Sequence, residues 1–193
     1  MEEYTIKPWA HNPITRHYEY LPDGVSATLE LTQNQWTLVD AEDIPDLIQW
    51  AWYAHWAPNI RGYYAIRNEP RGNGKQKVVR MSRYLTNAKR DFVVDHISHN
   101  TLDNRKDNLR VCLNSENGQN RAGMQSNNTS LYKGVSYHKH TGKWQAKIRV
   151  NNSDKHLGLF DSPQDAALAH DEAVRKYHGV YGTSNSDLGR ISA

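Results

Sequence analysis

The stretch from Asp95 to Asn117 is mostly polar. Apolar Val93, Val94 and Ile97 flank the Asp-His pair at its start, and Leu109 and Val111 begin a second strand-like run. The residues between these runs are rich in Asn and Asp, which favour a tight loop over a regular element. A polar segment follows over residues 114–121, where an Asn or Ser can cap a short helix. The pattern therefore predicts a strand, a loop, a second strand and a short helix.

Four side chains in this stretch have the chemistry that phosphodiester hydrolysis needs. A hard divalent cation takes oxygen ligands, and Asp95 and Asn117 supply two while leaving positions for water and phosphate. His96 titrates near neutrality and can accept a proton from water, with Asn108 as a candidate to orient its ring. Mg²⁺ or Mn²⁺ is the expected cofactor. No zinc is expected, because a single cysteine excludes a multi-cysteine site. A structural histidine in an Asn-rich loop is the alternative.

The spacing of these residues resembles that of the HNH nucleases with the ββα-metal fold, especially the phage-type homing endonucleases. The matching residues are Asp95-His96, Asp103-Asn104-Arg105, Asn108-Leu109-Arg110 and Asn117. Asn in the last position corresponds to the HNN variant. The resemblance implies that His96 is the general base, that Asn108 orients it, and that Asp95 and Asn117 are the metal ligands.

Composition and charge indicate several small cores and a polyanionic partner. Hydrophobic residues make up 37% of the 193 residues, and Trp and Tyr (6 and 11) outnumber Phe (2). Net charge is −7 over residues 1–60, +12 over 61–160 and −2 over 161–193. A basic block of this length suits nucleic acid, although a solvated basic surface is the alternative. The N-terminus lacks an apolar leader, so we expect a cytoplasmic protein, in a bacterium or phage-infected host, with no membrane association.

The N-terminal residues predict a small α+β region that ends in a basic hairpin. Strands are expected at residues 18–20, 27–31 and 36–40, and a helix from Asp43 to about Trp56. Residues 62–67 and 77–81 predict a hairpin with a cationic tip that can follow a phosphate backbone, although simple solvation is as good an explanation. The cations proposed to contact DNA here are Arg71, Lys75, Lys77, Arg80 and Arg83, with Arg105 from the nuclease motif.

Residues 143–150 alternate apolar and polar side chains, which is typical of a strand with one buried face. Strands over 132–138 and 155–160 would complete a three-stranded antiparallel sheet. Ser162 then caps a helix that ends at Gly179, and its alanines face the sheet. The other face of the sheet is left exposed and cationic, and a strand ribbon of this kind fits the DNA major groove.

This block resembles the Apetala-two/ethylene-response-factor DNA-binding domain. The residues that carry the resemblance are Tyr132-Lys133-Gly134-Val135, Gly142-Lys143-Trp144, Ile148-Arg149, Leu157-Gly158-Leu159-Phe160 and an Ala-rich helix followed by Asn185. The resemblance implies that the sheet contacts DNA. The residues at DNA-contacting positions are Lys133, Ser136, His138, His140, Lys147, Arg149 and His156, and Lys143 shares the polar face of its strand. Ser136, His138 and His140 depart from the common residues, so no target sequence is implied.

These patterns predict an α+β chain with five segments. They are an N-terminal region (1–90), an HNH motif (91–122), a linker (123–129), a DNA-binding domain (130–185) and a tail (186–193). The expected function is a homing-type, metal-dependent DNA endonuclease acting on double-stranded DNA, with a homodimer as one route to cutting both strands. Three alternatives remain: a DNA-binding regulator with a degenerate HNH fold, an HNH restriction endonuclease, and an RNA-cleaving nuclease.

Overall fold

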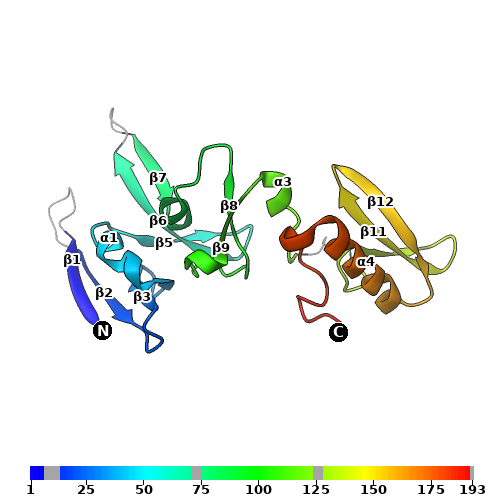
Figure 1. The fold of residues 1–193 in the computed structure, drawn as a ribbon, viewed down its shortest axis with the longest axis horizontal. Helices are drawn as coiled ribbons and strands as arrows, with labels where there is room; N and C mark the ends of the chain where they lie inside the picture. Colours follow the sequence, from blue (N-terminus) through cyan, green and yellow to red (C-terminus); the bar gives the residue numbers. More distant parts are fainter. Residues whose placement is uncertain (7–13, 71–74, 124–127, 192–193) are drawn as a thin grey trace. The chain divides into compact units, whose positions relative to one another are not determined.

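The computed structural model describes residues 1–6, 14–70, 75–123 and 128–191, which form two compact units, Met1–Leu113 and Asn114–Ala193 (Figure 1). Antiparallel sheets combine with helices in both units, so the predicted α+β class is confirmed. In the described ranges, no helix has the length and apolar character needed to cross a membrane. The contact boundary follows Leu113, and the predicted domain ranges remain predictions.

The first unit begins with a four-stranded antiparallel sheet in the order β1-β2-β3-β4. Its strands are β1 (Glu2–Ile6), β2 (Ile14–Tyr20), β3 (Ser26–Glu30) and β4 (Trp36–Asp40). The tight turn between β2 and β3 contains Gly24 at φ +71°, and the Asp23 carboxylate accepts the N–H groups of Val25 and Ser26. The three strands predicted in this region are confirmed.

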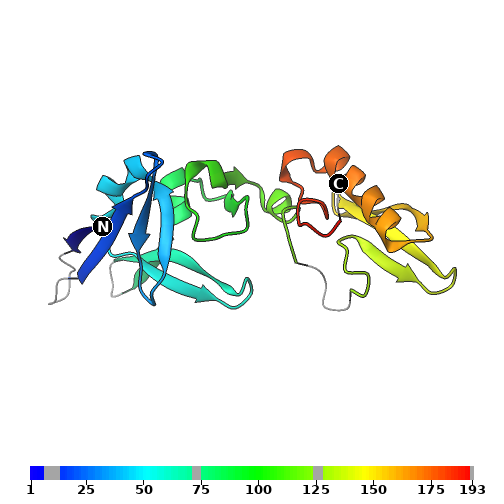
Figure 2. The same ribbon diagram turned by 90° about the horizontal axis from the view of Figure 1, so that it is seen from below.

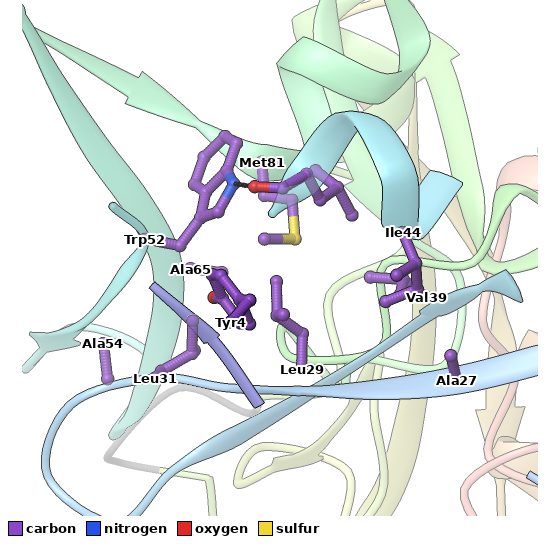
Figure 3. Packing of buried hydrophobic residues seen from close by; sticks show 11 residues of the cluster. Tyr4, Ala27, Leu29, Leu31, Val39, Ile44, Trp52, Ala54, Ala65 and Met81 are labelled. Carbon is purple, nitrogen blue, oxygen red and sulfur yellow. Dashed lines mark hydrogen bonds between the residues drawn. The ribbon is translucent and has the colours of Figure 1, made fainter. Parts of the chain in front are cut away.

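The predicted helix from Asp43 to about Trp56 is wrong beyond its first turn. The chain forms a 3₁₀ turn η1 (Ala41–Asp43) and a short helix α1 (Ile44–Leu47), and then strand β5 (Tyr53–Ala57). The Leu47 carbonyl accepts the backbone N–H of Trp50 at 3.1 Å and the indole N–H of Trp52 at 3.0 Å, the dashed line in Figure 3. The helix ends there because β5 pairs with the next strand, and apolar spacing alone does not reveal that pairing.

A second sheet in the order β5-β6-β7 contains the predicted basic hairpin. It consists of β5, β6 (Gly62–Pro70) and β7 (Gln76–Arg80), and helix α2 (Met81–Thr86) follows directly. One core joins the two sheets and α1, as Figure 3 shows. Its most buried members include Ala27, Leu29, Leu31, Val39, Ile44, Leu47, Trp52 and Met81.

The HNH stretch forms the predicted strand, loop and strand. They are β8 (Val93–His96), a loop with the 3₁₀ turn η2 (Lys106–Asn108), and β9 (Leu109–Cys112), with β8 and β9 antiparallel. The following helix α3 (Asn114–Asn117) belongs to the second unit and is shorter than the predicted 114–121. After Gly118 the backbone hydrogen bonds join residues three apart instead of four, as from Gln119 N to the Glu116 carbonyl at 2.9 Å. The helix stops here because Gly is a poor helix former.

The second unit contains a three-stranded antiparallel sheet covered by one helix, as predicted. The elements are β10 (Val135–His138), β11 (Lys143–Val150), β12 (Ser153–Phe160), α4 (Pro163–Tyr177) and the 3₁₀ turn η3 (Gly179–Tyr181). The Ser162 hydroxyl accepts the Asp165 N–H at 3.1 Å, which confirms the predicted cap. In Figure 2 helix α4 lies along one face of the sheet, and Ala146, Ile148, Ala166 and Ala173 are buried between them.

Candidate active site and nucleic-acid interface

Asp95 and His96 end strand β8 and are almost completely buried, with 7% and 6% of their surfaces exposed. They pair across the hairpin with Arg110 and Leu109 of β9. A buried carboxylate must have a compensating charge or several hydrogen bonds, because desolvation disfavours its ionised form. The structure therefore buries an acid and an imidazole that are consecutive in the chain, at the base of one polar loop.

The His96 ring is held in an environment that keeps it neutral. Its Nε2 lies 3.2 Å from Asn104 Oδ1, and the ring of Tyr64 is 6.3 Å away. Burial lowers the pKa of His96 below its ordinary value, and the Asn104 contact and the Asp95 charge only partly oppose this. A neutral imidazole at neutral pH is the form that a general base requires.

Arg110 supplies the charge that compensates Asp95. Its Nη2 lies 2.5 Å from Asp95 Oδ2, and both side chains are largely buried, at 13% and 8% exposure. Removing one member of such a pair leaves an uncompensated buried charge. A divalent cation would give this carboxylate the same kind of partner, so the donor chemistry of Asp95 fits the metal expected from the sequence.

Asn108 has both ends of its side chain engaged within the loop. Its Oδ1 accepts the Ser98 N–H at 2.8 Å, and its Nδ2 donates to the Asp103 carbonyl at 2.7 Å. Asn108 thus ties the start of the loop to its end. Orientation of His96 through the Asn108 side chain remains a prediction, whereas Asn104 provides the ring contact described above. Sequence reasoning gave Asn104 no role, although it stands in the Asp103-Asn104-Arg105 motif.

The Arg105 guanidinium, predicted to contact DNA, forms a two-pronged ion pair with Asp103. The distances are 2.9 Å from Nε to Oδ1 and 2.7 Å from Nη2 to Oδ2. Burial opposes ionisation of Asp103, but the Arg105 hydrogen bonds outweigh it and hold the pKa of that carboxyl below its ordinary value. Arg105 retains 38% side-chain exposure, so it reaches solvent while bound to Asp103.

Asn117, the second predicted metal ligand, lies at the end of α3 in the second unit. Its sharing of one ion with Asp95 stays a prediction. Within the part of the chain that the structure describes, no three His, Cys, Asp or Glu side chains gather into a metal-binding group. A site with few protein ligands is the way proteins usually bind Mg²⁺, with water and substrate phosphate completing the shell.

The cations of the basic hairpin differ in how available they are. Lys75, Lys77 and Arg80 are exposed, with Lys77 3.5 Å from Glu69 and the Arg80 guanidinium 4.4 Å from the centre of the Tyr64 ring. Arg83 instead donates to the carbonyls of Phe92, Ala88 and Lys89 at 2.7 to 3.0 Å, so it holds the chain between α2 and β8. Arg71 lies outside the described residues.

Six predicted DNA-contacting residues occupy the sheet face opposite α4, which we call the cationic sheet face. They are Ser136, His138, Lys143, Lys147, Arg149 and His156. Residues directly opposite each other on paired strands share a face, which places Ser136 beside Gln145, His138 beside Lys143, and His156 beside Lys147. Asp154 shares this face and pairs with Lys147 at 3.2 Å. His140 is exposed in the turn between β10 and β11.

Lys133 is turned into the protein, which does not fit the expectation that it contacts DNA. Its Nζ donates to the carbonyls of Gln119 and Thr183 at 2.9 Å each. Burial and the nearby Arg190 charge lower the pKa of Lys133 to about 8. Lys133 joins segments that are far apart in the sequence, so composition alone gave no indication of this role.

Asp171 and Asn185 form a buried hydrogen-bond network that sequence reasoning did not identify. Asp171, 1% exposed, accepts four hydrogen bonds from the backbone and side chains of Asn185 and Ser186 at 2.7 to 2.9 Å. The Asn185 oxygen in turn accepts the Lys133 N–H at 2.6 Å. This network connects the segment after α4 to the segment before β10. Of Asp171 and Asn185, only Asn185 was singled out in the sequence.

His170 predicts acid sensitivity of the second unit. Burial lowers its pKa to about 4, whereas an unfolded histidine binds a proton near pH 6.5. The unfolded state therefore takes up the proton first, and the free energy of unfolding should fall by about 3 kcal/mol as pH drops from about 6.5 to about 4. Hydrogen exchange of β11 amides at several pH values measures this. His170→Gln should flatten the pH dependence, whereas His156→Gln on the exposed face should leave it; equal slopes for all three chains would contradict the assignment.

Comparison with known proteins finds similarity to two different groups of proteins. Residues 88–119 match the HNH endonuclease family model. AP2-like ethylene-responsive transcription factor AIL5 of Arabidopsis thaliana is 42% identical over 67 residues, which are 34% of this chain and 12% of that protein. CRL5 of Oryza sativa subsp. japonica, also named an AP2-like ethylene-responsive transcription factor, is 42% identical over 67 residues (34% and 10%). Ethylene-responsive transcription factor WRI1 of Arabidopsis thaliana is 38% identical over 65 residues (33% and 15%).

The chain thus spans 10% to 15% of the length of these three relatives. No solved structure matches it. The HNH match covers both strands of the β8–β9 hairpin, the loop between them and helix α3. The chain therefore contains a segment similar to HNH endonucleases and a stretch of 67 residues similar to part of AP2-like proteins.

Proposed function

We propose that this protein is a divalent-cation-dependent DNA endonuclease whose second unit binds duplex DNA. The observation that supports it most is the buried pair of Asp95 and neutral His96 at the end of β8, inside the segment that matches HNH endonucleases. Neither the pair nor the match alone defines an activity. Together they support a role for His96 as proton acceptor and for Asp95 as metal ligand, in a segment similar to proteins that are named endonucleases.

In the proposed reaction His96 accepts the proton of the attacking water. Asp95 and Asn117 would hold Mg²⁺ or Mn²⁺, which stabilises charge on the phosphate and the leaving oxygen when bound. Arg110 lies against the same Asp95 carboxylate and orients it. Asn108 keeps the loop closed around this site through its bonds to Ser98 and Asp103.

Double-stranded DNA is the proposed partner of the cationic sheet face. The relatives that match about a third of this chain are named transcription factors, and β-strands of an antiparallel sheet can enter the major groove. A binding unit on the same chain raises the local concentration of the hydrolytic site near its target without any further contact. A homing role in a phage or mobile element, in the cytoplasm of the host cell, is the setting that we propose.

Removing two cations from the cationic sheet face should weaken DNA binding but preserve the chemistry. We expect Lys147→Ala/Arg149→Ala to bind duplex DNA at least about tenfold more weakly and to lower the salt dependence by about two phosphate contacts. The control is Arg175→Ala/Lys176→Ala, which removes the same charge from exposed positions of α4. Gel-shift titration at several salt concentrations measures both. An unchanged affinity in the first variant would remove the sheet from the binding surface.

A DNA-binding regulator with a degenerate HNH segment is the second candidate, because the relatives that match about a third of this chain are named transcription factors and Asn stands at position 117. Incubation of the full chain with supercoiled plasmid and Mg²⁺, with and without a chelator, separates the two. Open-circular product, abolished by the chelator, supports a nicking enzyme, and linear product a double-strand cutter. A homodimer or two encounters would give the linear form, since each chain has one proposed site. Unchanged plasmid that is nevertheless bound supports the regulator.

A further inference from the structure

Strand β4 of the N-terminal sheet holds the loop that faces His96. Leu38 N donates to the Leu102 carbonyl at 2.8 Å, and Asn104 N donates to the Leu38 carbonyl at 2.7 Å. A parallel bridge joins Leu38 to Asp103. Residues 102–104 therefore run beside β4 as a short extra strand, which fixes the backbone position of Asn104.

Thr37, the neighbour of Leu38, binds the same segment through its side chain. Its Oγ1 donates to the Leu102 carbonyl at 2.8 Å and accepts from Asn104 Nδ2 at 2.9 Å. Asn104 Oδ1 then lies 3.2 Å from His96 Nε2. Thr37 is fully buried and Asn104 is 2% exposed, so water does not compete for these bonds.

The direction of each hydrogen bond from Thr37 through Asn104 to His96 determines which ring nitrogen carries the imidazole proton. A hydroxyl has a single proton, and the Leu102 carbonyl takes it, because the other acceptor, Met81 Sδ, is 3.9 Å away and weaker. Thr37 must therefore accept from Asn104, which turns the Asn104 amide nitrogen towards Thr37 and its oxygen towards His96. An amide oxygen only accepts, so His96 Nε2 must carry the proton.

We propose that Thr37 and Asn104 are positioning residues that hold His96 as its Nε2–H tautomer and so assign Nδ1 as the nitrogen that accepts the proton from water. The inference rests on the proposed function, because the role of His96 as a base belongs to it. A fold that selects the tautomer keeps the basic nitrogen defined in every molecule, as the second partner of a catalytic or ligating histidine generally does.

The tautomer can be measured without any cleavage assay. The full chain, labelled with ¹⁵N-histidine, is placed at a pH where the imidazoles are neutral, and long-range ¹H–¹⁵N correlation shows which ring nitrogen carries hydrogen. His96→Ala identifies the His96 signals among the 10 histidines. We expect Nε2–H in the native chain. Nδ1–H in the native chain would overturn the inference without the need for any Thr37 variant.

Two substitutions of Thr37 then test whether its hydroxyl fixes the His96 tautomer through Asn104. Thr37→Val keeps the shape but removes the hydroxyl, so we expect a mixture of His96 tautomers and a kcat about 10- to 100-fold lower, with KM for DNA unchanged. Thr37→Ser retains the hydroxyl and should restore both readouts. A Thr37→Val chain in which His96 keeps the Nε2–H tautomer would overturn the positioning role of Thr37.

The two proposals fail in different ways. A chain that cleaves DNA while His96 carries Nδ1–H overturns this inference alone. A chain with the Nε2–H tautomer that cleaves no DNA in Mg²⁺ overturns the proposed function, and with it the catalytic meaning of the tautomer.

Discussion

Gly134→Ala is expected to unfold the second unit or to destabilise it by about 3 kcal/mol or more. A Cβ atom on Gly134 would lie 1.9 Å from His170 Cδ2 and 2.4 Å from His170 Nε2, and His170 is buried under the sheet with 3% exposure. Overpacking against this buried imidazole costs about 1–3 kcal/mol and adds to the cost of a left-handed backbone at φ +75°, about 1–2 kcal/mol. Duplex DNA binding should be lost with the fold.

Gly142→Ala separates the clash from the backbone strain. Gly142 has a similar φ of +67°, but the nearest atom to its added Cβ is Tyr137 Oη at 3.7 Å. This control should therefore cost only about 1–2 kcal/mol and keep DNA binding. Hydrogen exchange of β11 amides and gel-shift titration measure the two effects. If Gly134→Ala is no less stable than Gly142→Ala, His170 does not pack against Gly134 as described.

His96→Ala is expected to lower the rate of DNA cleavage by about 10² to 10⁴-fold, the usual contribution of a general base. DNA affinity should remain within a few-fold of the native value, because a neutral imidazole supplies no charge to the phosphate backbone. The measurement is a single-turnover cleavage rate at saturating protein, beside a gel-shift titration in the presence of chelator.

His99→Asn is the matched control for this substitution. His99 lies three residues away in the same loop at φ +68°, a conformation that asparagine adopts readily. We predict no catalytic role for it, so its cleavage rate should stay within a few-fold of native. Equal losses of binding and cleavage in His96→Ala would show that the histidine supports the fold and takes no part in the chemistry.

The sequence predicted the elements whose patterns are local. Three features depend only on residues close together in the sequence, and the structure contains all of them. They are the alternating strand Lys143–Val150, the Ser162 cap and the Asn-rich loop after His96. The stretch from Asp43 to Trp56 failed because its apolar residues enter the same core whether they lie on a helix or on a strand. Trp52 is buried between α1 and β5, and the pairing of β5 with β6 determines the structure there.

The contacts that define the candidate site are less accessible to sequence reasoning. His96 and Asp95 carry a motif, but the Thr37 hydroxyl that binds Asn104 is 67 residues away in a strand with no functional pattern. The carbonyl contacts of Lys133 could not be predicted from the sequence for a related reason. Its carbonyl partners belong to segments 14 and 50 residues away, and a single sequence does not show that the chain brings them together.

The Asp95 carboxylate is proposed to bind a divalent cation near His96, and Mn²⁺ binding tests this claim most directly. Electron paramagnetic resonance of free Mn²⁺ gives the affinity of the full native chain, of Asp95→Asn and of Asp161→Asn, a control at an exposed carboxylate. We predict one Mn²⁺ per native chain, with the affinity at least about tenfold weaker in Asp95→Asn and unchanged in Asp161→Asn. Equal binding by native chain and Asp95→Asn would contradict the claim.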